Sequence, residues 1–154
     1  MNNQVKIRNA IHQDVDKLVK FNSQMALETE NLQLDNSTLN RGVNAVINDP
    51  DRGFYLIAEI DGKVSGSLMI TTEWSDWRNA DYWWIQSVYV APPFRRQGIF
   101  RALYAEAKKR AAQNNTVCGC RLYVERNNTP AQKTYKNLGF VETHYKVFEE
   151  MFPK

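Results

Sequence analysis

Two arginines and a glycine follow a strand-like segment at the point where a long amphipathic stretch begins. The sequence Arg95-Arg96-Gln97-Gly98-Ile99 comes directly after Pro92-Pro93, whose missing N–H donors end a strand. The first N–H groups of a helix have no intrahelical partner, and a glycine lets an anion approach them closely. This spacing predicts a phosphate-binding turn. With one glycine it is neither a Walker loop nor a dinucleotide fingerprint, and the alternative is a solvated basic turn.

A second cluster lies further along the chain, where a strand pattern gives way to a helix pattern. Asn128 falls in the turn between them, and Ala131 and Tyr135 occupy one face of the helix, a turn apart. Thr129-Pro130 is typical of a helix start, and Gly139 of a helix end. Taken alone, Tyr135 is better explained as a tyrosine packed on the sheet with a solvated hydroxyl.

The pair of clusters resembles the signatures of the GNAT superfamily of acyl-CoA-dependent N-acetyltransferases. The first is similar to Arg/Gln-x-x-Gly-x-Gly/Ala. The second is similar to Val-x-x-x-Asn-x-x-Ala-x-x-x-Tyr-x-x-x-Gly-Phe and is matched by Val124, Asn128, Ala131, Tyr135, Gly139 and Phe140. The resemblance implies transfer of an acetyl group from acetyl-CoA to a primary amine, with a small molecule as the expected acceptor, by direct attack in a ternary complex.

The resemblance also implies which residues contact acetyl-CoA. The pyrophosphate would lie on backbone N–H groups of Arg96, Gln97, Gly98, Ile99, Phe100 and Arg101, with charge from Arg95 and Arg96. The pantetheine arm would pair with Val88, Tyr89 and Val90 and contact Asn128 and Ala131. A backbone N–H near Val88 and Tyr89 would stabilise the carbonyl oxygen.

Tyr135 matches the position whose hydroxyl points at the thioester sulfur, which implies a general acid. A phenol with a pKa of about 10 can protonate a leaving thiolate, whose thiol has a pKa of about 8.5, when that thiolate is desolvated.

Two residues depart from the family pattern. Phe100 replaces the usual small residue, so its ring is expected to point away from the pyrophosphate, into the helix–sheet contact. Gln86 aligns where similar enzymes often place a glutamate, and an amide cannot accept a proton as a base. Deprotonation of the amine would then need a water relayed to Glu73, Asp81, Glu125 or an acid in residues 28–35. Gln86 therefore keeps open the alternative of a non-catalytic acyl-CoA sensor.

Acids and aromatic rings gather in the segments where this family places the acceptor, and both suit a cationic amine. The candidate acceptor residues are Glu28, Glu30, Trp74, Trp84 and Gln86. The alternative is that the acids are solvated and that at least one of Trp83 and Trp84 belongs to the core. A peptide or protein amine is the alternative acceptor.

Hydrophobic periodicity predicts the elements that position these residues. Strands are expected at residues 5–8, 54–60, 63–72, 81–90, 117–125 and 141–152, the last as one or two strands, and helices from residue 14, at 39–47, at 98–114 and from 129. Residues 72–80 are expected to form a loop, and Asp61-Gly62 a hairpin turn. The order βααβββαβαβ(β) predicts a single α/β (α+β) domain over residues 1–154. Its mixed, mostly antiparallel sheet has six to seven strands flanked by about four helices.

Composition narrows the class of protein. The 154 residues are 43% hydrophobic and 24% charged, which is typical of one globular domain. The net charge of +3 is too small for a nucleic-acid footprint, although Arg95-Arg96 and residues 108–110 keep a weak nucleic-acid alternative open. Apolar runs fall short of the roughly 18 residues of a membrane span. Residues 1–6 lack the apolar block of a signal peptide, so we expect a cytoplasmic protein.

The sulfur and imidazole groups do not form a metal-ligand pattern. Cys118 and Cys120 are predicted to be small buried strand residues, and His12 and His144 lie at the two ends of the chain. This spacing predicts no metal site and no disulfide framework. Edge strands near the C-terminus could pair between two copies of the chain in a homodimer.

Overall fold

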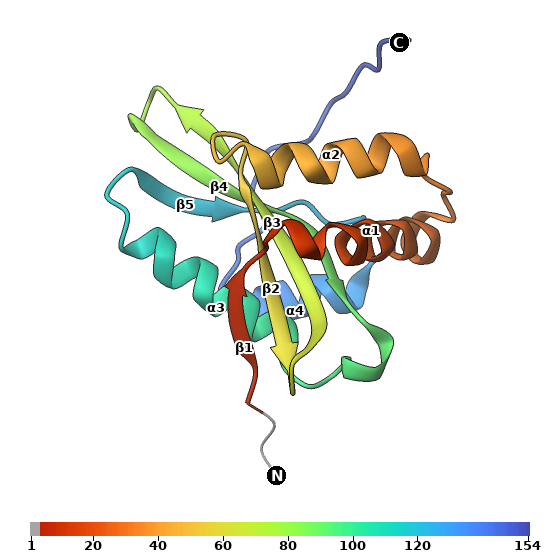
Figure 1. The fold of residues 1–154 in the computed structure, drawn as a ribbon. Coiled ribbons are helices and arrows are strands. Elements are labelled where there is room, and N and C mark those ends of the chain that lie inside the picture. The colour runs from red at the N-terminus through yellow and green to blue at the C-terminus, as the bar shows by residue number, and fades with distance from the viewer. Residues whose placement is uncertain (1–3) are drawn as a thin grey trace. The chain divides into compact units, whose positions relative to one another are not determined.

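A computed structural model describes residues 4–154; residues 1–3, part of the segment expected to lack a signal peptide, lie outside the described residues. The chain divides into two compact units, one ending at Leu122 and the other spanning Tyr123–Lys154. The first unit contains β1 (Lys6–Asn9), η1 (His12–Asp14), α1 (Val15–Glu30), α2 (Asn36–Asn48), β2 (Phe54–Ile60), β3 (Lys63–Ser75), β4 (Ala80–Val90), η2 (Pro92–Phe94), α3 (Ile99–Ala112) and β5 (Val117–Arg121). The second contains α4 (Thr129–Asn137) (Figure 1).

The first unit is built on a five-stranded sheet whose spatial order, β1-β2-β3-β4-β5, equals its chain order. Neighbouring strands are antiparallel except for β4 and β5, which are parallel because α3 crosses over between them. The β2–β3 turn has positive φ at both Asp61 and Gly62, as predicted from this residue pair. The observed order is the expected one as far as α4.

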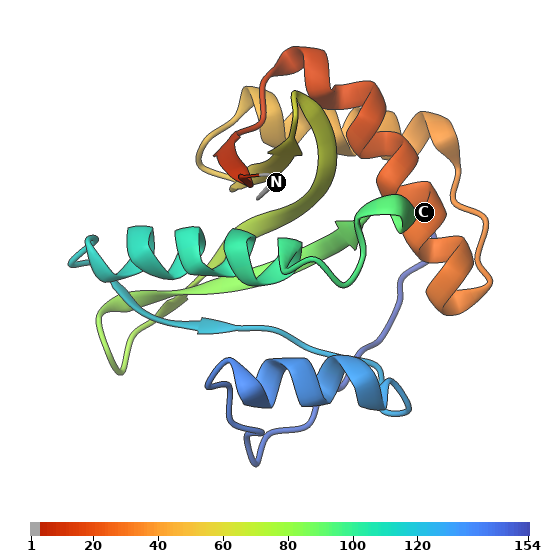
Figure 2. The same ribbon diagram turned by 90° about the horizontal axis from the view of Figure 1, so that it is seen from below.

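Helices cover the sheet through apolar stripes. α1 and α2, which lie side by side in Figure 2, pack Val15, Leu18 and Val43 against Tyr55 and Ile57 of β2. Leu103 and Ala107 of α3 are completely buried. Burial of a leucine, isoleucine or valine side chain contributes on the order of 1.5–3 kcal/mol to the free energy of unfolding. The sheet that carries the candidate site is thus stabilised by its own core within the first unit.

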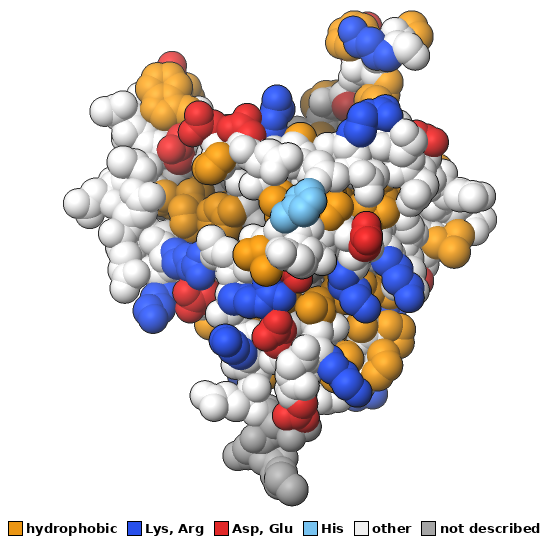
Figure 3. All heavy atoms as spheres, viewed as in Figure 1, with side chains coloured by type: hydrophobic (Ala, Val, Ile, Leu, Met, Phe, Trp, Pro, Cys, Tyr) orange, Lys and Arg blue, Asp and Glu red, His pale blue; other side chains and the backbone are white. Residues whose placement is uncertain are grey.

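An ion-pair network fixes the start of the chain to the sheet. Arg8 donates to both carboxylate oxygens of Asp14, at 2.7 and 2.9 Å, and to Glu59 at 2.8 Å. Asp14 is 6% exposed and also accepts the N–H of Ile11. Burial by itself would raise the pKa of Asp14, but the hydrogen bonds from Arg8 and Ile11 outweigh it and hold that pKa below its ordinary value. On the face shown in Figure 3, acidic and basic side chains are interspersed around β1 and α3, as on a solvated surface.

The structure corrects several expectations. The sheet has five strands within residues 4–154, not six to seven, and residues 141–152 form no strand. Their alternation is present, but Val147 and Phe148 are 76% and 90% exposed, and an alternating pattern becomes a strand only when its backbone groups meet a neighbouring strand. β5 also ends earlier than expected, at Arg121 and not at residue 125, because its pairing with β4 stops at Arg121.

Two smaller expectations on this sheet are also wrong. The expected loop at residues 72–80 is shorter in the structure: β3 and β4 pair as far as Ser75 and Ala80, and only residues 76–79 form the turn between them. The strands extend this far because an aromatic side chain takes part in each of the preceding cross-strand pairs. Cys118 is exposed, not buried, since β5 lies at the sheet edge. No helix within residues 4–154 combines the length and the apolar character needed to cross a membrane.

Candidate active site

The turn before α3 has the backbone shape that the sequence predicts for an anion site. Gly98 is the residue before the first turn of α3, with φ 76°, and Arg96 also has a left-handed φ of 63°. No side chain in the described part of the chain caps this helix end, and a Cβ added to Gly98 would meet no described atom within 4 Å. The N-terminus of α3 therefore has no side-chain cap among the described residues, has free space beside Gly98, and carries the partial positive charge of a helix N-terminus.

Arg95 is directed back into the protein. Its Nε donates to the carbonyl oxygen of Val90 at 2.9 Å, and its Nη2 donates to Glu28 at 2.7 Å. Its guanidinium also lies over the ring of Tyr89, 5.4 Å from the centroid. The Arg95 side chain thus makes contacts that stabilise the turn.

The Phe100 side chain, at the place of the family's usual small residue, packs against a neighbouring residue of α3. Its half-buried ring stacks on Tyr104 of the same helix, with centroids 6.3 Å apart and planes at 15°. Ile99, before it, is 2% exposed and lies against Gly66 of β3. The bulky residue in the first signature is therefore packed along the helix.

β4 contains a bulge next to the segment expected to pair with pantetheine. Ser87 has φ 51°, and the register with β3 shifts between the pairs Met69–Gln86 and Ser67–Tyr89. A bulge bends a strand and leaves backbone groups out of the ladder. The parallel pairing with β5 ends at Trp84 within the described residues. The stretch 85–90, which contains Val88, Tyr89 and Val90, consequently has a backbone edge that β5 does not use.

Polar side chains of β3, β4 and β5 meet in the stretch of sheet just before this bulge. Gln86 donates to Thr71 Oγ1 at 2.5 Å. The indole N–H of Trp84 donates to Glu73 at 2.7 Å, and Arg121 pairs with the same carboxylate at 3.2 Å. This group brings together two predicted residues, Trp84 and Gln86, with one proposed proton acceptor, Glu73. Trp83, the other member of the tryptophan pair, is 8% exposed, which confirms that one of them belongs to the core.

The remaining expected acceptor residues lie apart from this group. Glu28 accepts the Tyr89 hydroxyl at 3.0 Å in addition to Arg95. Glu30 is exposed at the last residue of α1, and Trp74 is 63% exposed and pairs with Asp81 towards the β3–β4 turn. Glu28 is directed at the turn before α3 because it lies near the C-terminal end of α1, a helix that packs against β4.

The second unit holds the second signature by local contacts. Asn128 is the N-cap of α4, and its Oδ1 accepts the backbone N–H of Ala131 at 3.2 Å. Tyr135 makes an edge contact with Phe140, 6.0 Å between centroids, and its carbonyl accepts the Phe140 N–H. Burial raises the pKa of the Tyr135 hydroxyl, which keeps it protonated at neutral pH.

Sequence reasoning missed three residues of the first unit. Ser87 carries no sequence signal, because a non-glycine residue with positive φ inside a strand is set by the neighbouring strand. Thr71 and Arg121 are ordinary strand residues until the register places them beside Gln86 and Glu73. A search for charged pairs between neighbouring strands would have required that register first.

Comparisons with known proteins agree with this geometry. A family profile described as the acetyltransferase (GNAT) family matches residues 17–140. An N-alpha-acetyltransferase from Sulfurisphaera tokodaii is 29% identical over 143 residues, covering 89% of this chain and 80% of the relative. A possible acetyltransferase from Clostridium difficile 630 is 40% identical, with a TM-score of 0.92 over 97% of this chain and 99% of that one.

A more distant structure, of an aminoglycoside N-acetyltransferase AAC(6')-Iy in complex with CoA, shares the fold with a TM-score of 0.79 at 19% identity, covering 98% of this chain and 97% of that one. The family match spans most of the chain. The protein therefore belongs to the GNAT acetyltransferase family and is an acyl-CoA-dependent N-acetyltransferase with the mixed α/β fold of that family.

Proposed function

We propose that the protein transfers the acetyl group of acetyl-CoA to the primary amine of a small molecule, by direct attack in a ternary complex. One observation carries this proposal: the pairing of β4 with β5 ends at Trp84. The bulge at Ser87 and then the uncapped N-terminus of α3 come next in the chain. One continuous segment, residues 85–101, thus offers a strand edge for an amide-containing arm and amide donors for a diphosphate.

In this proposal, the backbone from Arg96 to Arg101 binds the pyrophosphate, with Gly98 at the closest approach. The edge of β4 at Val88 and Tyr89 pairs with pantetheine, and an N–H near the bulge stabilises the oxyanion that forms when the amine attacks. The carbonyl of Val90 already accepts Arg95 Nε, so we place the arm mainly on the two residues before it.

Asn128, Ala131 and Tyr135 enter the proposal through the match of the second signature. The cap fixes the Asn128 side chain through its Oδ1, and its amide N–H groups are the donors for the pantetheine arm. The Tyr135 hydroxyl, protonated at neutral pH, donates its proton to the CoA thiolate as the thioester breaks. The new amide bond and the free thiol are the products.

Removal of the proton from the acceptor ammonium requires a base other than Gln86. Among the carboxylates considered from the sequence, Glu73 lies next to Trp84, two residues from Gln86 along β4. Both carboxylates pair with an arginine, Glu73 with Arg121 and Glu28 with Arg95, so the choice rests on position: in the described chain, Glu28 bonds to the turn before α3 and not to the residues around Gln86. We therefore assign the amide of Gln86 to orienting a water, and Glu73 to accepting the proton through it.

Glu73 and Trp84 offer a carboxylate and an aromatic ring in competition with Arg121, which already pairs with Glu73 and lies over the Tyr82 ring at 3.6 Å. The acceptor in this proposal is accordingly a cationic small-molecule amine. The aminoglycoside N-acetyltransferase with the same fold is consistent with it. The N-alpha-acetyltransferase of Sulfurisphaera tokodaii supports the second candidate, a peptide α-amine, and is the reason to test both.

The test is thiol release from acetyl-CoA with a panel of diamines, polyamines, an aminoglycoside and peptides with free N-termini. Turnover with at least one small amine, at a kcat/KM well above that for every peptide, is the expected result. A higher kcat/KM for peptides than for every small amine would identify a peptide α-amine as the acceptor in place of a small molecule. Binding of acetyl-CoA without turnover across the panel would favour the acyl-CoA sensor.

A further inference from the structure

We propose that Glu28 is a positioning residue for coenzyme A, acting through Arg95 and Tyr89 on the turn that binds the pyrophosphate. This inference rests on the proposed placement of the cofactor. The two carboxylate oxygens of Glu28 are used separately: Oε1 accepts the Tyr89 hydroxyl at 3.0 Å, and Oε2 accepts Arg95 Nη2 at 2.7 Å. A single side chain from α1 therefore contacts both the end of β4 and the beginning of the turn.

Arg95 completes this set of contacts. Its Nε bonds to the carbonyl of Val90, the last residue of β4, while its guanidinium covers the Tyr89 ring. Burial and the bond to Glu28 raise the pKa of Tyr89, so its hydroxyl stays a donor to the carboxylate. The guanidinium and the carboxylate together set the direction in which the chain leaves β4.

The turn needs such support because its backbone is strained. Arg96 adopts φ 63°, a conformation that a side chain with a Cβ rarely occupies, and Gly98 follows with φ 76°. Strained residues persist when surrounding contacts determine them. The contacts at Arg95, directly before Arg96, are placed to do this.

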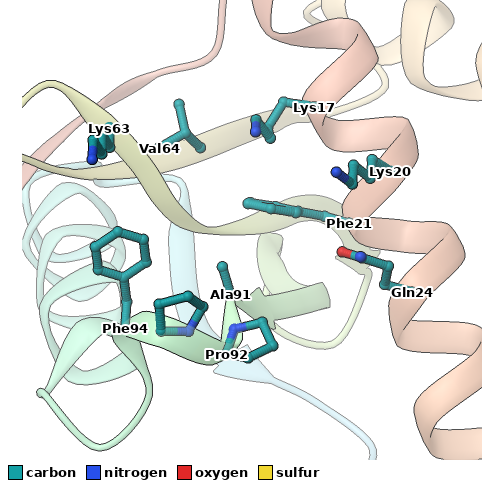
Figure 4. Close-up of a pocket in the computed structure, with 10 residues that line it drawn as sticks. Lys17, Lys20, Phe21, Gln24, Lys63, Val64, Ala91, Pro92 and Phe94 are labelled. Carbon is teal, nitrogen blue, oxygen red and sulfur yellow. The ribbon is translucent and has the colours of Figure 1, made fainter.

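Packing between α1 and the segment before the turn is incomplete, so the position of the turn relative to α1 depends more strongly on the contacts of Glu28. Figure 4 shows Lys17, Lys20 and Gln24, which lie between the first turn and the middle of α1, facing residues 91–94. The open hollow between them has a volume of about 390 Å³. The ring of Phe21 packs against the ring of Tyr89 on β4, with 5.0 Å between the two centroids. Beyond the hollow, the hydrogen bonds that Glu28 accepts from Tyr89 and Arg95 join the helix to the end of β4 and the turn.

This role differs measurably from the acceptor contact first expected of Glu28. If Glu28 positions the turn, its loss raises the Kd of CoA and leaves the KM of the amine unchanged. If Glu28 binds the amine, its loss raises that KM and leaves the Kd of CoA unchanged. Neither oxygen of Glu28 reaches the Gln86 group through a hydrogen bond in the described chain, which favours the first outcome.

The experiment is calorimetric titration of Glu28→Ala and Glu28→Gln with CoA, together with KM and kcat for acetyl-CoA and the amine. The ion pair is half exposed, so we expect about fivefold weaker CoA binding for Glu28→Ala and about twofold for Glu28→Gln, with the KM of the amine unchanged. The matched control is Glu106→Ala, which breaks a pair of similar exposure with Arg110 inside α3 and should not change the Kd.

A double-mutant cycle of Glu28→Gln with Arg95→Gln separates positioning from simple stabilisation. Coupling between the two changes in the Kd of CoA supports the proposal. Coupling in the melting temperature alone, or Glu28→Ala binding CoA as the wild type does, overturns it. If the wild-type protein itself does not bind CoA, the failure belongs to the proposed function.

Discussion

The two signature segments of this chain are stabilised over very different sequence distances. In the first, Arg95 bonds to Glu28, which is 67 residues earlier in the chain. In the second, Asn128 caps the N–H of Ala131, only three residues later. The turn before α3 is therefore a product of tertiary contacts, whereas the start of α4 is specified by its own neighbours.

This difference predicts different responses to mutation. A turn held by distant residues can be altered by changes far away in sequence, with cofactor affinity as the sensitive readout. A helix start held by a local cap should lose local order without affecting the sheet of the first unit. The following four predictions test that contrast, beginning with the largest effect.

Tyr135→Phe should lower kcat roughly tenfold to a thousandfold, the range for loss of a general acid, because the ring contact with Phe140 survives and only the hydroxyl is lost. The Kd of acetyl-CoA should change little. Steady-state kinetics and titration measure both. Tyr145→Phe, a change at an exposed tyrosine of the same unit, is the control. An unchanged kcat would remove Tyr135 from its catalytic role.

Gly98→Glu should weaken CoA binding by about a hundredfold, since a carboxylate would occupy the open approach to the α3 amides and repel a diphosphate. Gly62→Glu is the matched control, because Gly62 has nearly the same φ, 74°, and equally open surroundings in the β2–β3 turn. It carries the same backbone strain without the phosphate site. Equal Kd values for the two variants would show that the pyrophosphate binds elsewhere.

Asp14→Asn should reduce the free energy of unfolding by about 2 kcal/mol, because Arg8 loses a partner in a mostly buried ion pair. The native pKa of Asp14 is lowered, so its stabilisation is present above the ordinary value near 3.8 and is lost as the pH falls through the native pKa. The difference between wild type and variant should therefore shrink below pH about 4. Urea denaturation at pH 7 and pH 3 measures it; a constant difference would contradict the assignment.

Asn128→Ala should have the smallest effect, about 1 kcal/mol, confined to the first turn of α4. Hydrogen exchange of the Ala131 amide reports it directly, since that N–H loses its acceptor. Asn128→Asp keeps a capping oxygen and should preserve protection. Faster exchange in β3 or β4 as well would mean that the second signature is not locally stabilised.

The resemblance to the family is largely encoded in short stretches of sequence. Gly98 after Pro92-Pro93, the Asp61-Gly62 turn and Asn128 before Pro130 each act through the conformational preference of the residue itself or of a near neighbour. Periodicity likewise gave all four helices to within a few residues. These features were predictable because the interactions that create them span a few positions.

The side-chain partners and the limits of the sheet were decided by the tertiary structure. Glu28, a candidate acceptor residue, bonds to Tyr89 and Arg95, and Gln86 bonds to Thr71 in a strand register that the bulge at Ser87 then shifts. Residues 141–152 alternate as strands do, yet they pair with nothing in the described chain. The physical reason is the same in each case: strand pairing and ion pairs depend on which distant segments are brought together, and a shift of one residue exchanges every partner.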